Sequence, residues 1–115
     1  MSVVKTSEIK LKIGLNKDKL PVKIDWQAEG GVSAGKPTEA KAFLLSIFDR
    51  TSRDTLKMDL WTKDMQVNEM DRFFFQTLRG LADTYFKATQ NQQLATDMQK
   101  FVQYFGEQTE VLPKQ

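Results

Sequence analysis

Two segments near the N-terminus alternate apolar and polar residues with a period of two. In residues 8–15 the odd positions are apolar, and in residues 20–27 the even positions are apolar. This period predicts two half-buried β-strands. The polar run at 16–19 predicts the turn of an antiparallel hairpin. Pro21 cannot donate a ladder hydrogen bond, which favours a place at a strand start or on a sheet edge.

A second predicted hairpin follows a Gly-rich segment, residues 29–38, which we expect to be a flexible loop. In residues 40–48, apolar residues occur at both odd and even positions, as expected for a central strand that is covered on both faces. Residues 49–54 form a charged turn, and residues 55–61 alternate again as a fourth strand.

The period changes beyond Thr62 to spacings of three and four, which predicts an amphipathic helix. Its apolar stripe contains Val67, Met70, Phe74, Leu78, Leu81 and Tyr85. Gly80 lies within this helix and indicates a close backbone contact, because glycine costs about 1 kcal/mol there relative to alanine. Thr89 and Gln92 match a capping box that would begin a second helix, with Gly106 as its C-terminal cap. We expect residues 107–115 to form a frayed tail.

Strands followed by helices indicate the α+β class. We predict a four-stranded antiparallel sheet of two hairpins, followed by two amphipathic helices packed on one face. The 115 residues and 40% hydrophobic content are enough for one core, so we expect residues 1–115 to form a single domain.

Composition restricts the chemistry available to the chain. Cysteine is absent, which fits a reducing compartment, and histidine is absent, which removes the usual general base and zinc ligand. No continuous apolar stretch indicates a signal peptide or membrane insertion, so we expect a cytoplasmic protein. The net charge of +2 and 28% charged residues are typical of a folded, soluble chain.

Residues 30–36 resemble a phosphate-binding loop, but Pro37 stands where that motif needs Ser or Thr. Proline lacks the hydroxyl group that would bind magnesium, and the segment that follows is predicted as a strand instead of a helix. We therefore interpret the motif as a flexible linker and expect no cofactor.

Three lysines on the first predicted hairpin could indicate a nucleic-acid-binding surface. Lys10, Lys12 and Lys23 share one predicted strand face, but Glu8 and Asp25 interrupt it. We interpret this face as solvated and protected from aggregation, with no nucleic acid as partner.

Four carboxylates surround the passage from the fourth strand into the first helix: Asp59, Asp64, Glu69 and Asp71. They could form a metal or acid–base site, but Glu69 and Asp71 near a helix start also stabilise its dipole. We favour that structural interpretation and predict neither a metal site nor catalytic residues.

The apolar residues of the third strand suggest a protein-interaction surface. Two helices can cover only one face of the sheet, which leaves the other face to be explained. We assign this candidate face to Phe43, Leu45, Ile47 and Trp61. The alternative is that the sheet curls or that a loop covers these residues.

Several sequence segments resemble the gliding motility protein GldC family. They are Thr-Ser-Glu-Ile-Lys-Leu at 6–11, Glu-Ala-Lys-Ala-Phe-Leu-Leu-Ser at 39–46 and Asp-Leu-Trp-Thr-Lys-Asp-Met at 59–65. The similarity continues through Phe74, residues 76–78, residues 83–84 and residues 88–90. The resemblance implies an accessory role in bacterial gliding, without enzymatic activity or cofactor.

We therefore expect a non-enzymatic adaptor of the gliding machinery that acts by protein–protein association. Its partner would be a component of the machinery or a second copy of the chain, in a homo-oligomer. The alternative is a SecB-like chaperone or cargo-binding protein, which shares the same order of elements but is weakly supported by order alone.

Overall fold

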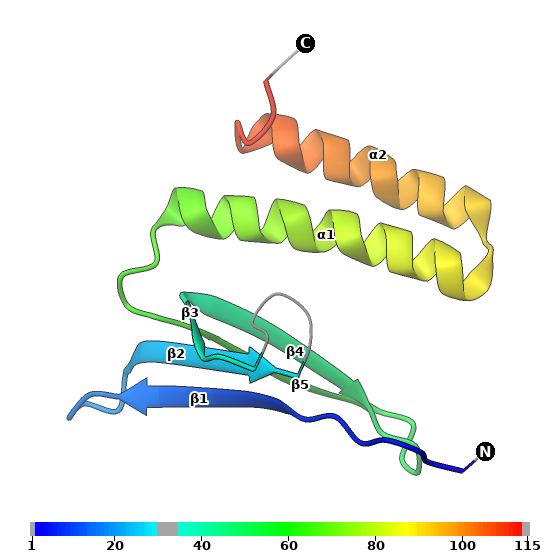
Figure 1. The fold of residues 1–115 in the computed structure, drawn as a ribbon. Helices are drawn as coiled ribbons and strands as arrows, with labels where there is room; N and C mark the ends of the chain where they lie inside the picture. The colour runs from blue at the N-terminus through cyan, green and yellow to red at the C-terminus, as the bar shows by residue number, and fades with distance from the viewer. Residues whose placement is uncertain (1, 30–34, 114–115) are drawn as a thin grey trace. The chain divides into compact units, whose positions relative to one another are not determined.

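The structure is a computed structural model that describes residues 2–29 and 35–113. Two compact units divide the chain at Met65, one spanning Met1–Met65 and the other Gln66–Gln115. Among these residues, the first unit contains five β-strands and the second contains two α-helices, in that order along the chain (Figure 1). The α+β class is confirmed, while the prediction of one domain stays a prediction.

Strands β1 (Ile9–Leu15) and β2 (Pro21–Ala28) form the first predicted hairpin. They pair antiparallel, from Ile9 opposite Ala28 to Leu15 opposite Pro21, with a bulge between Gly14 and Leu15. The turn is held by the side chain of Asn16, whose Oδ1 accepts hydrogen bonds from the backbone N–H groups of Asp18 and Leu20.

The third predicted strand is interrupted at Lys41, so the prediction of one four-stranded sheet is wrong. Strand β3 (Thr38–Ala40) pairs with β2, whereas β4 (Ala42–Phe48) pairs with β5 (Thr55–Trp61). The described residues therefore form a three-stranded sheet, β1-β2-β3, and a two-stranded sheet, β4-β5. The chain bends between β3 and β4, so one extended stretch contributes to both ladders.

The β4–β5 hairpin ends in the predicted charged turn. The Asp49 carboxylate accepts hydrogen bonds from the backbone N–H groups of Thr51 and Ser52. These bonds lower the pKa of Asp49, chiefly through Ser52. Arg53 completes the turn with a φ of 60°, in the left-handed region.

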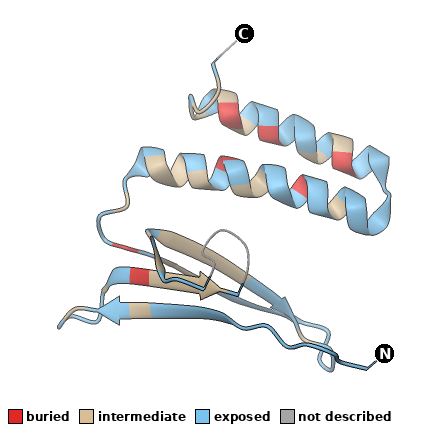
Figure 2. Ribbon diagram, viewed as in Figure 1, coloured by how far each residue is buried: buried red, intermediate tan, exposed pale blue. Residues whose placement is uncertain are grey.

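Among the described residues of the β unit, Ile24 is the one hydrophobic residue that is buried, with 0% of its surface exposed. It lies on the middle strand β2, opposite Ile13 of β1 and Ala40 of β3 (Figure 2). Directly opposite residues share a face of an antiparallel sheet. One face of the three-stranded sheet is therefore apolar around Ile24.

The second unit is an antiparallel pair of helices, α1 (Val67–Thr89) and α2 (Gln92–Gln108). The backbone N–H of Gln66 donates to the Glu69 carboxylate at 3.0 Å, which confirms a structural role for Glu69 at the helix start. Among the described residues, neither helix combines the length and apolarity needed to cross a membrane.

The predicted capping box at Thr89 and Gln92 is wrong. Thr89 is the last residue of α1, and its hydroxyl donates to the Tyr85 carbonyl at 2.8 Å. Gln90 then adopts a left-handed conformation, and Asn91 caps α2 by accepting a hydrogen bond from the Leu94 N–H at 3.1 Å. Asn and Thr are both favoured N-cap residues, but Thr89 still belongs to α1, so Asn91 caps α2.

The buried interface between the helices differs from the stripe predicted for α1. Its buried residues are Phe75 and Ala82 on α1 and Ala95, Val102 and Gly106 on α2 (Figure 2). Of the predicted stripe, Leu81 is 52% exposed and Val67 is 80% exposed. The side of α1 that packs against α2 therefore differs from the most apolar stripe of α1. Small side chains such as Ala82 lie at the contact, because they allow the two helices to approach closely.

Helix α2 continues to Gln108, so Gly106 is not its C-terminal cap and the predicted frayed tail begins too early. The Leu112 N–H donates to the Gly106 carbonyl at 2.9 Å, which folds the chain back after the helix. A Cβ at Gly106 would lie 2.7 Å from both the Leu112 and Phe75 side chains. A side chain at this position would therefore require Leu112 or Phe75 to move.

Candidate protein-interaction site

The register of the β4–β5 hairpin separates the four predicted interaction residues. Phe43, Leu45 and Ile47 lie opposite Leu60, Met58 and Leu56, whereas Trp61 lies opposite Ala42. Because opposite residues share a face, Trp61 is on the other side of the hairpin from the first three. The predicted grouping of Trp61 with Phe43, Leu45 and Ile47 is therefore wrong. Periodicity in separate strands does not fix their mutual register.

The register reveals a fully apolar face that the sequence patterns alone did not group. We call it the apolar hairpin face, and it consists of Phe43, Leu45, Ile47, Leu56, Met58 and Leu60. Three of these side chains are largely exposed, with 51% for Ile47, 60% for Leu56 and 53% for Met58. Contiguous exposed apolar surface of this kind is typical of protein-interaction sites.

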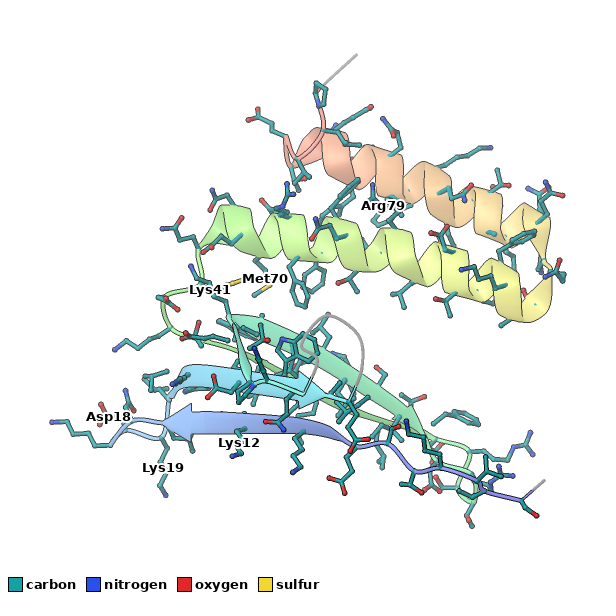
Figure 3. All side chains as sticks on the ribbon, viewed as in Figure 1. Lys12, Asp18, Lys19, Lys41, Met70 and Arg79 are labelled. Carbon is teal, nitrogen blue, oxygen red and sulfur yellow. The ribbon has the colours of Figure 1, made fainter. Side chains whose placement is uncertain are left out.

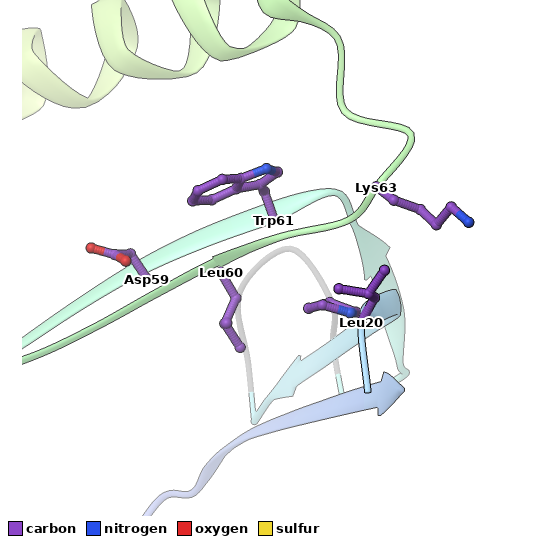
Figure 4. A pocket seen from close by; sticks show the side chains of 6 residues that line it. Leu20, Asp59, Leu60, Trp61 and Lys63 are labelled. Atoms are coloured by element: carbon purple, nitrogen blue, oxygen red, sulfur yellow. The ribbon is translucent and has the colours of Figure 1, made fainter. Parts of the chain in front are cut away.

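Trp61 borders a groove at the end of β5, which we call the Trp61 groove (Figure 4). Its volume is about 390 Å³, and its lining residues are Leu20, Pro21, Asp59, Leu60, Trp61 and Lys63. Figure 4 shows the Trp61 and Leu60 side chains on opposite sides of β5. The indole is 55% exposed, so it is available to a partner at the edge of a largely apolar groove.

Thr62 and Lys63, directly after Trp61, connect the two sheets. The Thr62 N–H donates to the Lys41 carbonyl at 2.8 Å, which extends the β4–β5 ladder. The Lys63 N–H donates to the Pro21 carbonyl at 3.3 Å, which links this segment to the start of β2. Thr62 is a buried polar residue, with 3% exposure. This segment therefore fixes the position of the Trp61 groove.

The Thr62 hydroxyl also bonds to the Asp64 carboxylate. This hydrogen bond is the main reason that the pKa of Asp64 lies below its ordinary value, and the charge of Lys41 lowers the pKa further. Burial acts in the opposite direction but more weakly than the Thr62 bond. The ionised form of Asp64 is thus favoured in the folded state.

Replacing Thr62 by Val should raise the pKa of Asp64 and lower the free energy of unfolding at neutral pH, because the hydrogen bond to the ionised carboxylate is lost. A lowered folded-state pKa stabilises the fold above the unfolded value of 3.8, and this contribution disappears as the pH falls through the folded value. The variant should therefore lose less stability than wild type on acidification below about pH 4. Carboxyl NMR titration and urea unfolding measure the two effects. Asp49 is the internal control, since its pKa depends on Ser52 and should not change.

The lysine strip lies where the strand pattern predicts it. Lys10, Lys12 and Lys23 share a face with Asp25, by the register of β1 and β2. Lys23 lies 3.8 Å from Asp25, and Lys10 lies 3.8 Å from Glu8. These acidic neighbours reduce the positive potential that nucleic acid would require. Figure 3 shows Lys12 and Lys19 projecting from the β1–β2 hairpin.

Three of the four candidate carboxylates have separate local partners. Asp59 pairs with Lys57, Asp64 bonds to Thr62, and Glu69 accepts from Gln66 at the start of α1. In residues 2–29 and 35–113, no group of three or more Asp or Glu side chains could hold a metal ion. For the phosphate-loop motif, residues 30–34 lie outside the described residues, while Thr38 after Pro37 begins a strand as predicted.

A second groove, in the helical unit, was missed by the sequence analysis. It has a volume of about 370 Å³, with Phe75, Val102 and Leu112 as apolar lining and Arg79 and Asp83 among its polar lining. The Arg79 guanidinium lies 5.3 Å from the Phe75 ring centre, a cation–π distance. Figure 3 labels Arg79 on the side of α1 nearest α2. No sequence motif indicated this groove, because it depends on the position of Leu112 after α2.

No curated protein matches the chain, and no solved structure matches it. The family model described as "Gliding motility-associated protein GldC-like" matches residues 21–111, from β2 through the end of α2, and includes the lining of the Trp61 groove except Leu20. This match covers well over half of the chain and confirms the resemblance found in its sequence. The chain therefore belongs to the GldC-like family of gliding motility-associated proteins.

Proposed function

We propose that this protein is a non-enzymatic adaptor of the gliding machinery, which acts in the cytoplasm by binding another protein through its β4–β5 hairpin. The observation that carries the proposal is the apolar hairpin face, with Ile47, Leu56 and Met58 each more than half exposed. Membership of a gliding-associated family supports the pathway. The partner is a machinery component or a second copy of the chain.

Trp61, on the opposite side of β5 from this face, offers a second anchor on the same hairpin. Tryptophan is enriched among residues that contribute most to binding, because it buries a large apolar area and carries one hydrogen-bond donor. Trp61 is more than half exposed, and Thr62 and Lys63 hold its backbone in place through Lys41 and Pro21. An anchor side chain on a fixed backbone loses little conformational freedom on binding.

Replacing Trp61 by Ala should therefore reduce binding to a gliding component at least ten-fold and impair gliding, while the folded structure remains. The test introduces the variant into a gliding bacterium and measures colony spreading and recovery of the bound component. Tyr104→Ala is a matched control, because Tyr104 is an aromatic residue of similar exposure, 59%, on α2. Normal gliding with Trp61→Ala would contradict the proposal. Unfolding of the variant would show that Trp61 contributes to the core instead.

The SecB-like alternative predicts a different activity for the same apolar surface. A chaperone would suppress aggregation of an unfolded client at stoichiometric amounts, whereas an adaptor would not. The exposed Met58 suits variable partners, because methionine side chains are flexible and polarisable. A light-scattering aggregation assay with wild type and Met58→Lys separates the two functions.

A further inference from the structure

The outer edge of β5 is free to pair with another strand. In the described part of the chain, β5 has β4 as its neighbour on one side and no strand on the other. Thr62 donates to Lys41, and Asp54 accepts from Asp49, across the hairpin. Backbone groups alternate sides along an antiparallel strand. The even-numbered residues of β5 therefore face β4, and the N–H and C=O groups of Thr55, Lys57, Asp59 and Trp61 point to the free edge.

The side chains along this edge are complementary to themselves. Lys57 and Asp59 flank Met58 and form an ion pair with each other within one chain. If two β5 strands met antiparallel about a two-fold axis at Met58, Lys57 of each copy would lie opposite Asp59 of the other. Leu56 would lie opposite Leu60, and Met58 opposite Met58. Opposite charges and apolar pairs at facing positions both stabilise a sheet.

We propose that the protein forms a two-fold symmetric dimer in which β5 pairs with β5 of a second copy in this register. The result is a four-stranded sheet, β4-β5-β5-β4, in which two apolar hairpin faces become continuous. An isologous contact of this kind closes after two copies and does not extend into a fibre. The inference rests on the proposed function in one respect, that the hairpin is the site of association.

Electrostatics select this register over its neighbours. Centring the axis on Lys57 would place lysine opposite lysine, and centring it on Asp59 would place aspartate opposite aspartate. Both arrangements keep the same outward backbone groups but are destabilised by like charges. The Met58-centred register is the one of the three that pairs Lys57 with Asp59.

The edge strand β1, on the outside of the three-stranded sheet, lacks this complementarity. Its charged residues are Lys10 and Lys12, so an axis at Lys10, Leu11 or Lys12 places lysine opposite lysine. A bulge also interrupts its ladder between Gly14 and Leu15. Lysines and bulges are features that protect edge strands from pairing. The chain thus disfavours self-association at β1 and favours it at β5.

The Trp61 groove is compatible with the proposed dimer. The Lys63–Pro21 hydrogen bond closes the edge after Trp61, so the free edge spans the seven residues of β5. In the Met58-centred register, Leu56 of the second copy lies opposite Leu60, which lines the groove. Leu56 is 60% exposed in the single chain, and contact with Leu60 of the second copy would cover part of it.

A cysteine at the symmetry axis tests the register directly. The chain has no cysteine, so Met58→Cys introduces a single thiol. The two introduced thiols would belong to directly facing residues whose Cα atoms are about 4.5 Å apart, which permits a disulfide. We expect a disulfide-linked dimer under mild oxidation and, by light scattering, a wild-type mass twice the 13.2 kDa chain. Leu11→Cys on the β1 edge is the control and should remain largely unlinked.

Charge exchange provides an independent test that does not depend on oxidation. Lys57→Asp leaves aspartate at both 57 and 59, and Asp59→Lys leaves lysine at both positions. Like charges would then face each other across the axis, so each variant alone should dimerise at least ten-fold more weakly. An equimolar mixture should form a heterodimer, because each lysine again faces an aspartate. A monomeric wild type, a Met58→Cys variant linked no faster than Leu11→Cys, or a mixture that stays monomeric would overturn the dimer.

The proposed function and the dimer can fail separately. If wild type is monomeric but still binds a gliding component through Trp61, the dimer is wrong and the adaptor function stands. If the Met58→Cys dimer forms but Trp61→Ala leaves gliding unchanged, the adaptor function through Trp61 fails and the dimer stands.

Discussion

Replacing Ile24 by Ala should lower the free energy of unfolding of the β unit by about 3 kcal/mol, the usual cost of truncating a buried isoleucine. Ile24 is fully buried on the middle strand of the three-stranded sheet, with Ile13 and Ala40 as its cross-strand neighbours. The loss combines removal of apolar contacts with the cavity left behind. Urea unfolding followed by tryptophan fluorescence measures it, because Trp26 and Trp61 both lie in Met1–Met65.

Ile9→Ala is the matched control for Ile24→Ala. Ile9 has the same side chain on the neighbouring strand β1, but it is 77% exposed. Its truncation should change the free energy of unfolding by about 0.5 kcal/mol or less. Equal effects at Ile9 and Ile24 would contradict the position of the core around Ile24.

Alanine should have opposite effects at the two helical glycines, with a difference of about 1.5 to 3 kcal/mol in the free energy of unfolding. At Gly106, an added Cβ would lie 2.7 Å from both Leu112 and Phe75, and Phe75 is buried between the helices. We expect about 1 to 2 kcal/mol of destabilisation from this overlap. At Gly80, an added Cβ has nothing within 4 Å among the described residues. Alanine should stabilise α1 there by about 0.5 to 1 kcal/mol.

Circular dichroism at 222 nm measures both glycine variants, because the helices lie in Gln66–Gln115. The double variant Gly106→Ala with Leu112→Ala is the test of mechanism. Shortening Leu112 should remove part of the overlap and recover part of the loss. Stabilisation by Gly106→Ala would show that Leu112 moves away without cost.

The space around Gly80 also corrects a sequence-based interpretation. Glycine inside the first helix predicts a close contact at Gly80, and the structure places that contact at Gly106 instead. The sequence analysis gave Gly106 another role, the C-terminal cap of the second helix. The distinction depends on Leu112, which folds back only after α2 has ended.

Local patterns predicted the elements more accurately than their connections. The alternation in residues 55–61 predicted β5 with its observed bounds, and the turn at 49–54 was also correct. The break at Lys41 was missed, because residues 40–48 are mostly apolar and carry no glycine or proline. Which partner a strand pairs with is decided by contacts distant in sequence, and these leave no local signal.

The candidate site shows the same limit. Phe43, Leu45 and Ile47 were correctly placed on one side of their strand, because alternation within a strand is local. Trp61 was assigned to the wrong face, because a shift of one residue in the register exchanges the faces of a strand. The run at 59–65 that carries the family resemblance was informative for another reason: its Thr62 and Lys63 connect both sheets.

The bend at Lys41 restricts the lengths that this part of the chain can have. Residues 38–48 contribute to two ladders in succession, so one inserted or deleted residue at the bend would turn every β4 side chain to the opposite face relative to β3. Length changes in the Asp49–Asp54 turn would leave the side chains of β3 and β4 on their present faces. Homologous chains should therefore accommodate insertions in that turn and keep a constant spacing between Ala40 and Ala42.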